Sequence, residues 1–152
     1  MIVLAIDPGI SGAFAWCDGN KLIAVEDMPT IEVRGKRRVS AANVSRIMQL
    51  YSVDLVVIEA VHSMPGQGVS SSFGFGRSLG VLEGVAAGLG LPVEMAVPAV
   101  WKRLAGVPAD KGAVRQMATQ YWPFQAELFK RAKDDGRADA ALMARWAAMR
   151  QR

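Results

Sequence analysis

The chain has 152 residues, 51% of them hydrophobic, which is enough for one domain with a core of ordinary size. Its 18 Lys and Arg residues against 14 Asp and Glu leave a net charge of +4, which is compatible with nucleic-acid binding. The lone Cys17 excludes an internal disulfide and is typical of a reducing compartment. No apolar run approaches ~18 residues, and the start MIVLAID lacks the features of a signal peptide. We expect one cytoplasmic domain over residues 1–152, without membrane contact.

The first part of the chain predicts strands. Residues 2–7 predict a strand in which residues 2–6 are all apolar, as in a strand buried on both faces. Residues 11–17 and 21–27 then form a hairpin around the turn Asp18-Gly19-Asn20. The polar stretch 32–39 is expected to be a loop.

The rest of the chain alternates helices with strands. Ser40 can cap a helix that extends to about residue 51. Residues 54–59 and 91–97 predict two more core strands, and a Gly/Ser-rich loop at 63–72 follows the first. Further helices are expected at residues 73–89, 99–105, 111–121 (capped by Asp110) and 135–150. The pattern is that of an α/β fold with an antiparallel hairpin near its start.

The last predicted helix carries acids on its expected buried face. At 100° per residue, Leu142, Trp146 and Met149 lie within about 40° of Asp135, and Asp139 falls inside the same arc. Ionised carboxylates on a buried face cost several kcal/mol unless a cation meets them. This placement indicates a functional site.

Two further acids end predicted strands, Asp7 at residues 2–7 and Glu59 at residues 54–59. In α/β sheets, sites form at the carboxyl ends of the strands. Four carboxylates there would suit one or two Mg²⁺ ions, which could activate water and stabilise the leaving oxygen of a phosphodiester. The sequence shows no zinc-ligand spacing and no evident Ser-His-Asp set.

Most of these acids also have a structural interpretation. Asp7 can shape a turn, Glu59 can mark where a strand reaches solvent, and Asp135 can cap the last helix. Asp139 is the hardest to explain in this way, because it lies one turn inside the helix. Asp134 points about 100° away from Asp135, which suits a cap or solvent exposure.

The order of these motifs resembles the RNase H-like nuclease superfamily, and within it RuvC-type Holliday junction resolvases, especially compact phage-borne ones. The matching stretches are IVLAIDPGISGAFAW (2–16), VVIEAVHSMPGQGVSSSFGFGRSLGVLEG (56–84), VPAVWKRLAGVPADK (97–111) and KDDGRADAALMA (133–144). The resemblance implies an RNase H-like fold, with a mixed sheet, an N-terminal antiparallel hairpin and helices on both faces.

The resemblance also implies a homodimeric, Mg²⁺-dependent endonuclease, with Mn²⁺ able to substitute, that nicks four-way DNA junctions symmetrically. Its metal ligands would be Asp7, Glu59, Asp135 and Asp139. One feature departs from the family pattern: bacterial members separate the last two acids by three residues, and here Gly136 lies three before Asp139. Asp135 lies four residues before Asp139, which still places both acids on one face of the helix. Asp135 is therefore assigned as the fourth metal ligand.

Several residues are candidate DNA contacts. The densest basic run is Arg34, Lys36, Arg37 and Arg38. The other candidates are Phe73, Arg77, Lys102 and Lys111; the two lysines lie in the region that approaches the scissile strand in the resembling family. The alternative for the basic run is a solvated loop, and the alternative for Phe73 is a place in the core instead of stacking on a base. His62 is interpreted as a local hydrogen-bond partner.

Gly76, Gly80, Gly84 and Gly88 recur every four residues in the helix predicted at 73–89. Each Gly costs a helix ~1 kcal/mol against Ala, so the stripe needs an explanation. It could pack against the sheet of its own chain. The family resemblance favours a two-fold dimer interface.

Parts of the sequence are also compatible with three other functions. A nuclease for flaps or other branched DNA would share the fold and the site. DPGISG (7–12) fits the phosphate-binding turn of actin-like and sugar-kinase ATPases, but these need two domains, and no GxxxxGK[ST] loop is present, so no nucleotide cofactor is expected. A non-catalytic DNA-binding module would be favoured by the loss of an acid.

Overall fold

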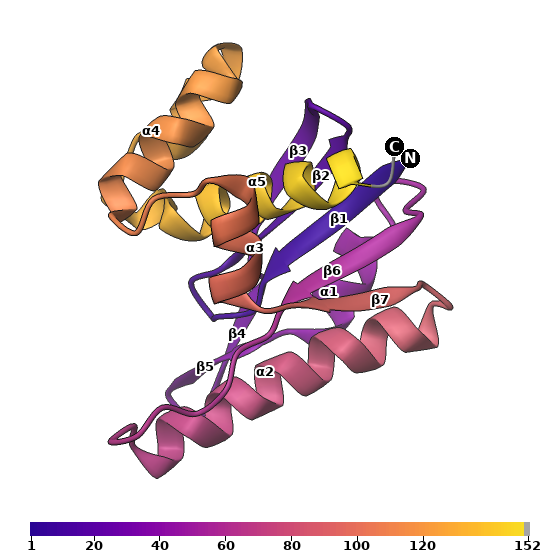
Figure 1. The fold of residues 1–152 in the computed structure, drawn as a ribbon. Coiled ribbons are helices and arrows are strands. Elements are labelled where there is room, and N and C mark those ends of the chain that lie inside the picture. The colour runs from indigo at the N-terminus through magenta and orange to yellow at the C-terminus, as the bar shows by residue number, and fades with distance from the viewer. Residues whose placement is uncertain (151–152) are drawn as a thin grey trace.

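The computed structural model describes residues 1–150 as a mixed sheet covered by helices on both faces (Figure 1). The strand order is β3-β2-β1-β6-β7. Strands β1 and β2 and strands β2 and β3 pair antiparallel, whereas β6 is parallel to both β1 and β7. The strands are β1 (Ile2–Asp7), β2 (Ala13–Asp18), β3 (Lys21–Asp27), β6 (Leu55–Glu59) and β7 (Val93–Ala96). The predicted mixed sheet and N-terminal hairpin are confirmed.

Alternating side chains of the central strand enter two separate cores. Val3 and Ala5 of β1 pack on the side of α3 (Pro98–Ala105), α4 (Lys111–Tyr121) and α5 (Asp135–Arg150). Leu4 and Ile6 pack on the side of α1 (Ala41–Met48) and α2 (Val69–Gly88). Because both faces are covered, β1 needs apolar residues at every central position, as its sequence shows.

The helix caps follow the sequence closely. The Ser40 side chain accepts a hydrogen bond from the Asn43 backbone at the start of α1, and Asp110 accepts one from Ala113 at the start of α4. Two short 3₁₀ helices, η1 (Pro123–Phe129) and η2 (Ala132–Asp134), connect α4 to α5. None of the helices within residues 1–150 is both long and apolar enough to cross a membrane.

The expected loop at 32–39 is wrong: these residues belong to a second, two-stranded sheet of β4 (Thr30–Val33) and β5 (Lys36–Val39). Arg34 and Gly35 connect the strands, with φ values of 51° and 76°. Two consecutive positive φ values make the tight turn that matches the twist of a hairpin. Val39 is fully buried and fixes the second strand to the core.

The predicted orientation of α5 is also wrong. Gly136, Ala140, Met143 and Ala147 lie toward the centre of its buried side, whereas Asp139 belongs to its least buried face. The helix packs against β1 and β2 and against α3 and α4, and many of its residues are alanine. A helix that is buried nearly all round has no polar–apolar contrast from which to read its inward face.

Candidate active site

Asp7 and Glu59 end neighbouring parallel strands. Ile6 of β1 pairs with Ile58 of β6, so the two carboxylates emerge at the same edge of the sheet. The first turn of α5 approaches this edge closely. A Cβ built on Gly136 would lie 3.1 Å from Asp7 Oδ2 and 2.8 Å from the Ser11 carbonyl oxygen. Glycine therefore allows α5 to lie directly against the loop that follows Asp7.

Asp7, Glu59 and Asp139 influence one another electrostatically. Burial raises the pKa of Asp7 to about 7, and the negative charges of Glu59 and then Asp139 contribute to the rise. Burial also raises the pKa of Glu59, and the charge of Asp139 adds to it. The site thus gathers more negative charge than its neighbours neutralise.

Two residues of α3 contact these carboxylates. Trp101 Nε1 donates a hydrogen bond of 3.0 Å to Glu59 Oε1, and the Lys102 ammonium lies 3.0 Å from Asp139 Oδ1. The charge of Lys102 lowers the pKa of both Asp7 and Glu59, against the larger effect of burial. Lys102 was predicted as a DNA contact, and it lies among the acids. Trp101 was not predicted, because an apolar residue gives no sequence signal of such a contact.

Asp135 has different partners from Asp139. Its carboxylate is hydrogen-bonded to Arg115, and Lys111 Nζ lies 3.8 Å away. Both cations come from α4. Asp135 is not among the charges that shift the pKa of Asp7 or Glu59. The carboxylate is therefore directed toward α4.

Asp134 caps the turn before α5. Its Oδ2 accepts a 2.8 Å hydrogen bond from the Arg131 backbone N–H, and its Oδ1 accepts one of 2.9 Å from the Arg131 guanidinium. The cap is confirmed. The alternative of solvent exposure is wrong, because the side chain is only 1% exposed.

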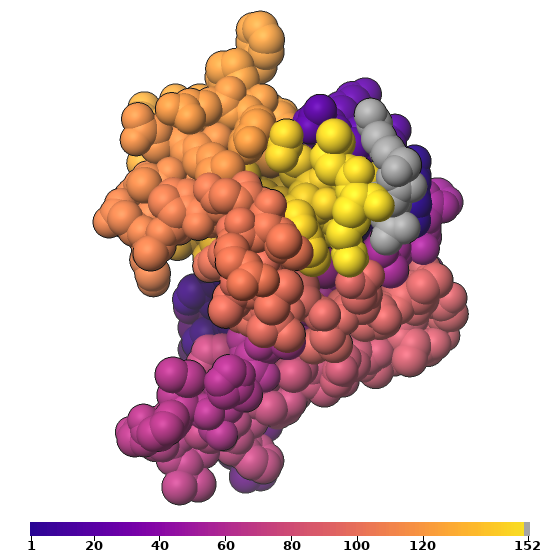
Figure 2. Space-filling view, viewed as in Figure 1, coloured from indigo at the N-terminus to yellow at the C-terminus, as the bar shows by residue number. Residues whose placement is uncertain are grey.

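The donor set fits a hard divalent cation. Within residues 1–150, no three acidic, His or Cys side chains are already arranged as metal ligands. Asp139 Oδ1 is nevertheless buried and accepts no hydrogen bond, although Lys102 lies close to it. Carboxylate oxygens are the ligands that Mg²⁺ prefers. Figure 2 shows a notch in the surface between the orange helices and the magenta segment after β6, with indigo residues of the N-terminal segment at its floor.

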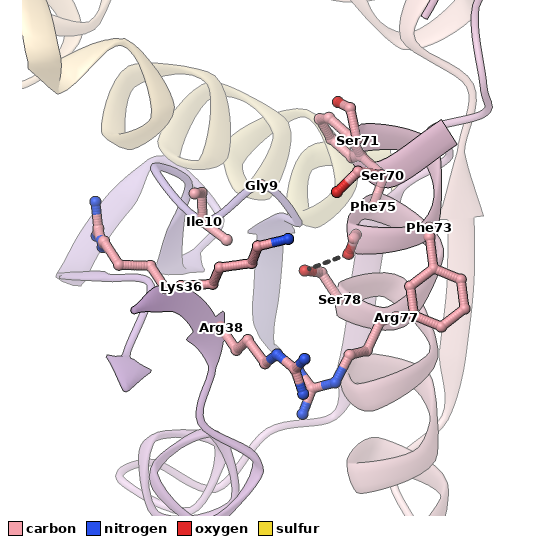
Figure 3. Close-up of a pocket in the computed structure, with 12 residues that line it drawn as sticks. Gly9, Ile10, Lys36, Arg38, Ser70, Ser71, Phe73, Phe75, Arg77 and Ser78 are labelled. Carbon is pink, nitrogen blue, oxygen red and sulfur yellow. Dashed lines mark hydrogen bonds between the residues drawn. The ribbon is translucent and has the colours of Figure 1, made fainter. Parts of the chain in front are cut away.

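The other predicted DNA contacts divide between two places. A cavity of about 310 Å³ between the β4–β5 hairpin and α2 is lined by Lys36, Arg37, Arg38, Phe73 and Arg77, among others (Figure 3). Arg34 lies at the hairpin turn, and Lys111 lies beside Asp135.

Phe73 is 75% exposed, so its interpretation as a core residue is wrong. His62 is exposed in the loop after β6.

The glycine stripe of α2 faces outward. Gly76, Gly80, Gly84 and Gly88 are exposed, and a Cβ at any of them would meet nothing within 4 Å. The helix packs on its own chain mainly through buried residues on its other side, among them Leu82 and Ala86. Packing of the glycines against their own sheet is therefore wrong.

Comparison with solved structures identifies the fold. RuvC of T. thermophilus in complex with a Holliday junction substrate matches with a TM-score of 0.72 and 21% identity, covering 99% of this chain and 94% of that chain. A second structure of Thermus thermophilus RuvC matches with a TM-score of 0.60 and 20% identity, covering 99% and 97%. Neither protein-family models nor curated protein sequences give a match. The chain has the RNase H-like fold of RuvC, as the sequence resemblance predicted.

Proposed function

We propose that this protein is a Mg²⁺-dependent endonuclease that resolves four-way DNA junctions by paired, symmetric nicks. The observation that carries the proposal is that Asp7 and Glu59 end the neighbouring strands β1 and β6, and that the charge of Asp139 raises the pKa of both. The shared fold with RuvC, which was solved on a Holliday junction substrate, supports the same assignment.

Asp7, Glu59 and Asp139 would hold Mg²⁺, with Mn²⁺ as a substitute, and the bound metal would supply water activation and charge stabilisation for phosphodiester hydrolysis. Trp101 orients Glu59 through its indole N–H. Lys102 offsets part of the negative charge of the site and, placed at its margin, would face the phosphate of a bound strand.

Asp135 is the acid whose proposed role changes most. Because its carboxylate is bound to Arg115 and lies close to Lys111, we assign it to positioning these two cations of α4 beside the site. The proposed ligand set is thus three carboxylates instead of four.

The proposed homodimer would form through the glycine stripe of α2. Strand β7 packs beside this helix at the edge of the sheet, and its Val93 and Met95 are 38% and 36% exposed. A smooth glycine surface beside exposed apolar side chains suits close packing against a second copy. Two sites related by a dyad could nick two strands of one junction.

The direct test compares a synthetic four-way junction, a matched duplex and a flap, each with Mg²⁺ and with EDTA. Asp7→Asn is the control. We expect paired nicks in the junction alone, lost in EDTA and in the variant. Equal cutting of the flap would indicate a broader debranching nuclease. Tight junction binding without any cutting would indicate a non-catalytic binding module.

A further inference from the structure

The cavity between the β4–β5 hairpin and α2, which we name the hairpin groove, is walled by the two elements on opposite sides. The hairpin side contributes Lys36, Arg37 and Arg38, and the helix side contributes Ser70, Ser71, Phe73, Gly74, Phe75, Arg77 and Ser78. Gly9 and Ile10, from the loop after Asp7, complete the lining. The groove therefore extends to the loop that follows Asp7.

The groove concentrates positive charge without a balancing acid. Elsewhere several cations have carboxylate partners, as Lys102 has Asp139 and Arg137 has Asp27. Within residues 1–150, none of the four cations of the groove forms an ion pair, and no Asp or Glu lines it. Figure 3 shows the guanidinium groups of Arg38 and Arg77 reaching toward each other from opposite walls. Guanidiniums that point toward each other repel unless an anion lies between them, and their planar donors match a phosphate group.

Aromatic and hydroxyl groups accompany these cations. Phe73 and Phe75 also line the groove and are 75% and 40% exposed, with the Phe73 ring on the side of α2 away from the hairpin (Figure 3), and Ser70 and Ser71 lie in the first turn of α2. Proteins that bind single-stranded nucleic acid typically have a positively charged groove with exposed aromatic rings. The bases stack on the rings, and the cations contact the phosphate backbone.

The groove is small, because a sphere of 310 Å³ is about 8 Å across. It therefore offers room for a short stretch of a single strand. Because Gly9 and Ile10 lie two and three residues after Asp7, a strand bound in the hairpin groove would pass close to the loop that carries this carboxylate.

We propose that the hairpin groove binds an unpaired DNA strand next to the position of the nick, with Arg38 and Arg77 holding its phosphates, so that an opened branch point is preferred to intact duplex. This inference rests on the proposed function in that it takes DNA as the substrate. The hairpin is then a device for recognising strand separation near the reacting strand.

The test measures binding in EDTA, where no cutting is expected, by fluorescence anisotropy. The probes are a duplex with a short single-stranded gap and an intact duplex of equal length. The variant Arg38→Ala/Arg77→Ala removes two groove cations, and Lys21→Ala/Arg46→Ala is the matched control, because it removes two exposed cations outside the groove. Lys36→Ala, also exposed, gives a single-residue version should the double variant fold poorly; thermal unfolding checks each protein.

We expect the groove variant to bind gapped DNA at least about 10-fold more weakly than the control variant at physiological salt. Its log–log salt slope should fall by about 1.4, since each single-strand phosphate contact contributes ~0.7. The two variants should differ little on intact duplex. Equal binding of gapped DNA by the two variants would overturn the proposal, and so would an equal loss on both DNAs.

Nicking of a four-way junction by the unaltered protein, measured in parallel with Mg²⁺, separates the two proposals. Nicking without any groove-specific binding loss rejects the hairpin groove alone. If the groove variant loses affinity for gapped DNA but the unaltered protein never nicks a junction, the nuclease is rejected and the proposed strand binding by the groove is retained.

Discussion

Asp139 and Asp135 lie one turn apart on α5, and their different partners give different expectations for substitution. Asp139→Asn should abolish stabilisation by Mg²⁺ and lower junction cleavage by at least about 10³-fold, because a ligand at the reacting centre is lost. Asp135→Asn should leave the Mg²⁺ midpoint unchanged and lower the free energy of unfolding by about 1 kcal/mol, since its ion pairs are partly exposed.

Thermal unfolding as a function of Mg²⁺ concentration distinguishes the two variants independently of cleavage. Junction cleavage by Asp135→Asn should fall mainly through weaker binding, because Lys111 and Arg115 lose the partner that positions them. A shift of the Mg²⁺ midpoint as large as that of Asp139→Asn would restore Asp135 as a metal ligand.

Asp7 should destabilise the metal-free protein when it is ionised. Its pKa rises from 3.8 in the unfolded chain to about 7 in the folded protein, so folding disfavours the charged form. The free energy of unfolding should therefore not be reduced by Asp7 below pH ~4, and should fall as the pH rises to about 7. Above that pH the contribution of Asp7 no longer changes. The negative charges of Glu59 and Asp139 add to the effect of burial on the pKa of Asp7.

The Asp7→Asn variant removes this ionisation. In EDTA, the variant and the unaltered protein should have the same melting temperature near pH 4. At pH 8 the variant should have the higher melting temperature. Addition of Mg²⁺ at pH 8 should reverse the order, since only the unaltered protein gains a bound cation. A melting temperature in EDTA at pH 8 no higher than that of the unaltered protein would contradict the electrostatic account of the site.

The sequence predicted some site residues better than others. Asp7 and Glu59 were recognisable because each ends an apolar strand, and adjacent parallel strands bring their ends together. Trp101 and Arg115 were missed, because their contacts with Glu59 and Asp135 join residues 42 and 20 positions apart. No local pattern encodes such contacts.

At the scale of secondary structure, α2 combines helix-weakening glycines with complete exposure of the stripe that they form. Gly80→Ala and Gly84→Ala together should stabilise the isolated helix by about 1–2 kcal/mol, because a Cβ meets nothing in this chain. If a second copy packs on the stripe, the same change should weaken the dimer. We expect a higher dissociation constant by analytical ultracentrifugation.

Replacement of Glu83, which is also exposed on α2, by Gln is the control for this measurement. An unchanged dimer in the double glycine variant, or a monomer in the unaltered protein at micromolar concentration, would place the glycines outside any interface.

The elements themselves were predictable to different degrees. The capped helices α1 and α4 were recognised because Ser40 and Asp110 give a local signal. The β4–β5 hairpin was missed because its turn uses Arg34 at positive φ, which is unusual for a residue with a side chain. The inward face of α5 was misassigned because burial on several sides removes the periodicity on which the prediction depended.

At the scale of the whole molecule, residues 1–150 contain the proposed carboxylate site once, at the carboxyl ends of β1 and β6. A single copy could therefore nick one strand at a time, and resolution of a junction requires two nicks. The proposed two-fold dimer supplies the second site. The proposed function would thus depend on assembly as well as on the three acids.

Mixed dimers test this dependence. In a population that combines unaltered and Asp7→Asn subunits, each mixed dimer has one intact site. Acting on a supercoiled plasmid with an extruded cruciform, unaltered dimers should give linear DNA, because both strands are nicked before the dimer leaves. Mixed dimers should give nicked circles. Subunits joined by a short flexible linker would fix the pairing, with a linked pair of unaltered subunits as the control. Linear product from the linked mixed pair at the rate of the control would show that one site makes both cuts, and the dyad would then have no part in resolution.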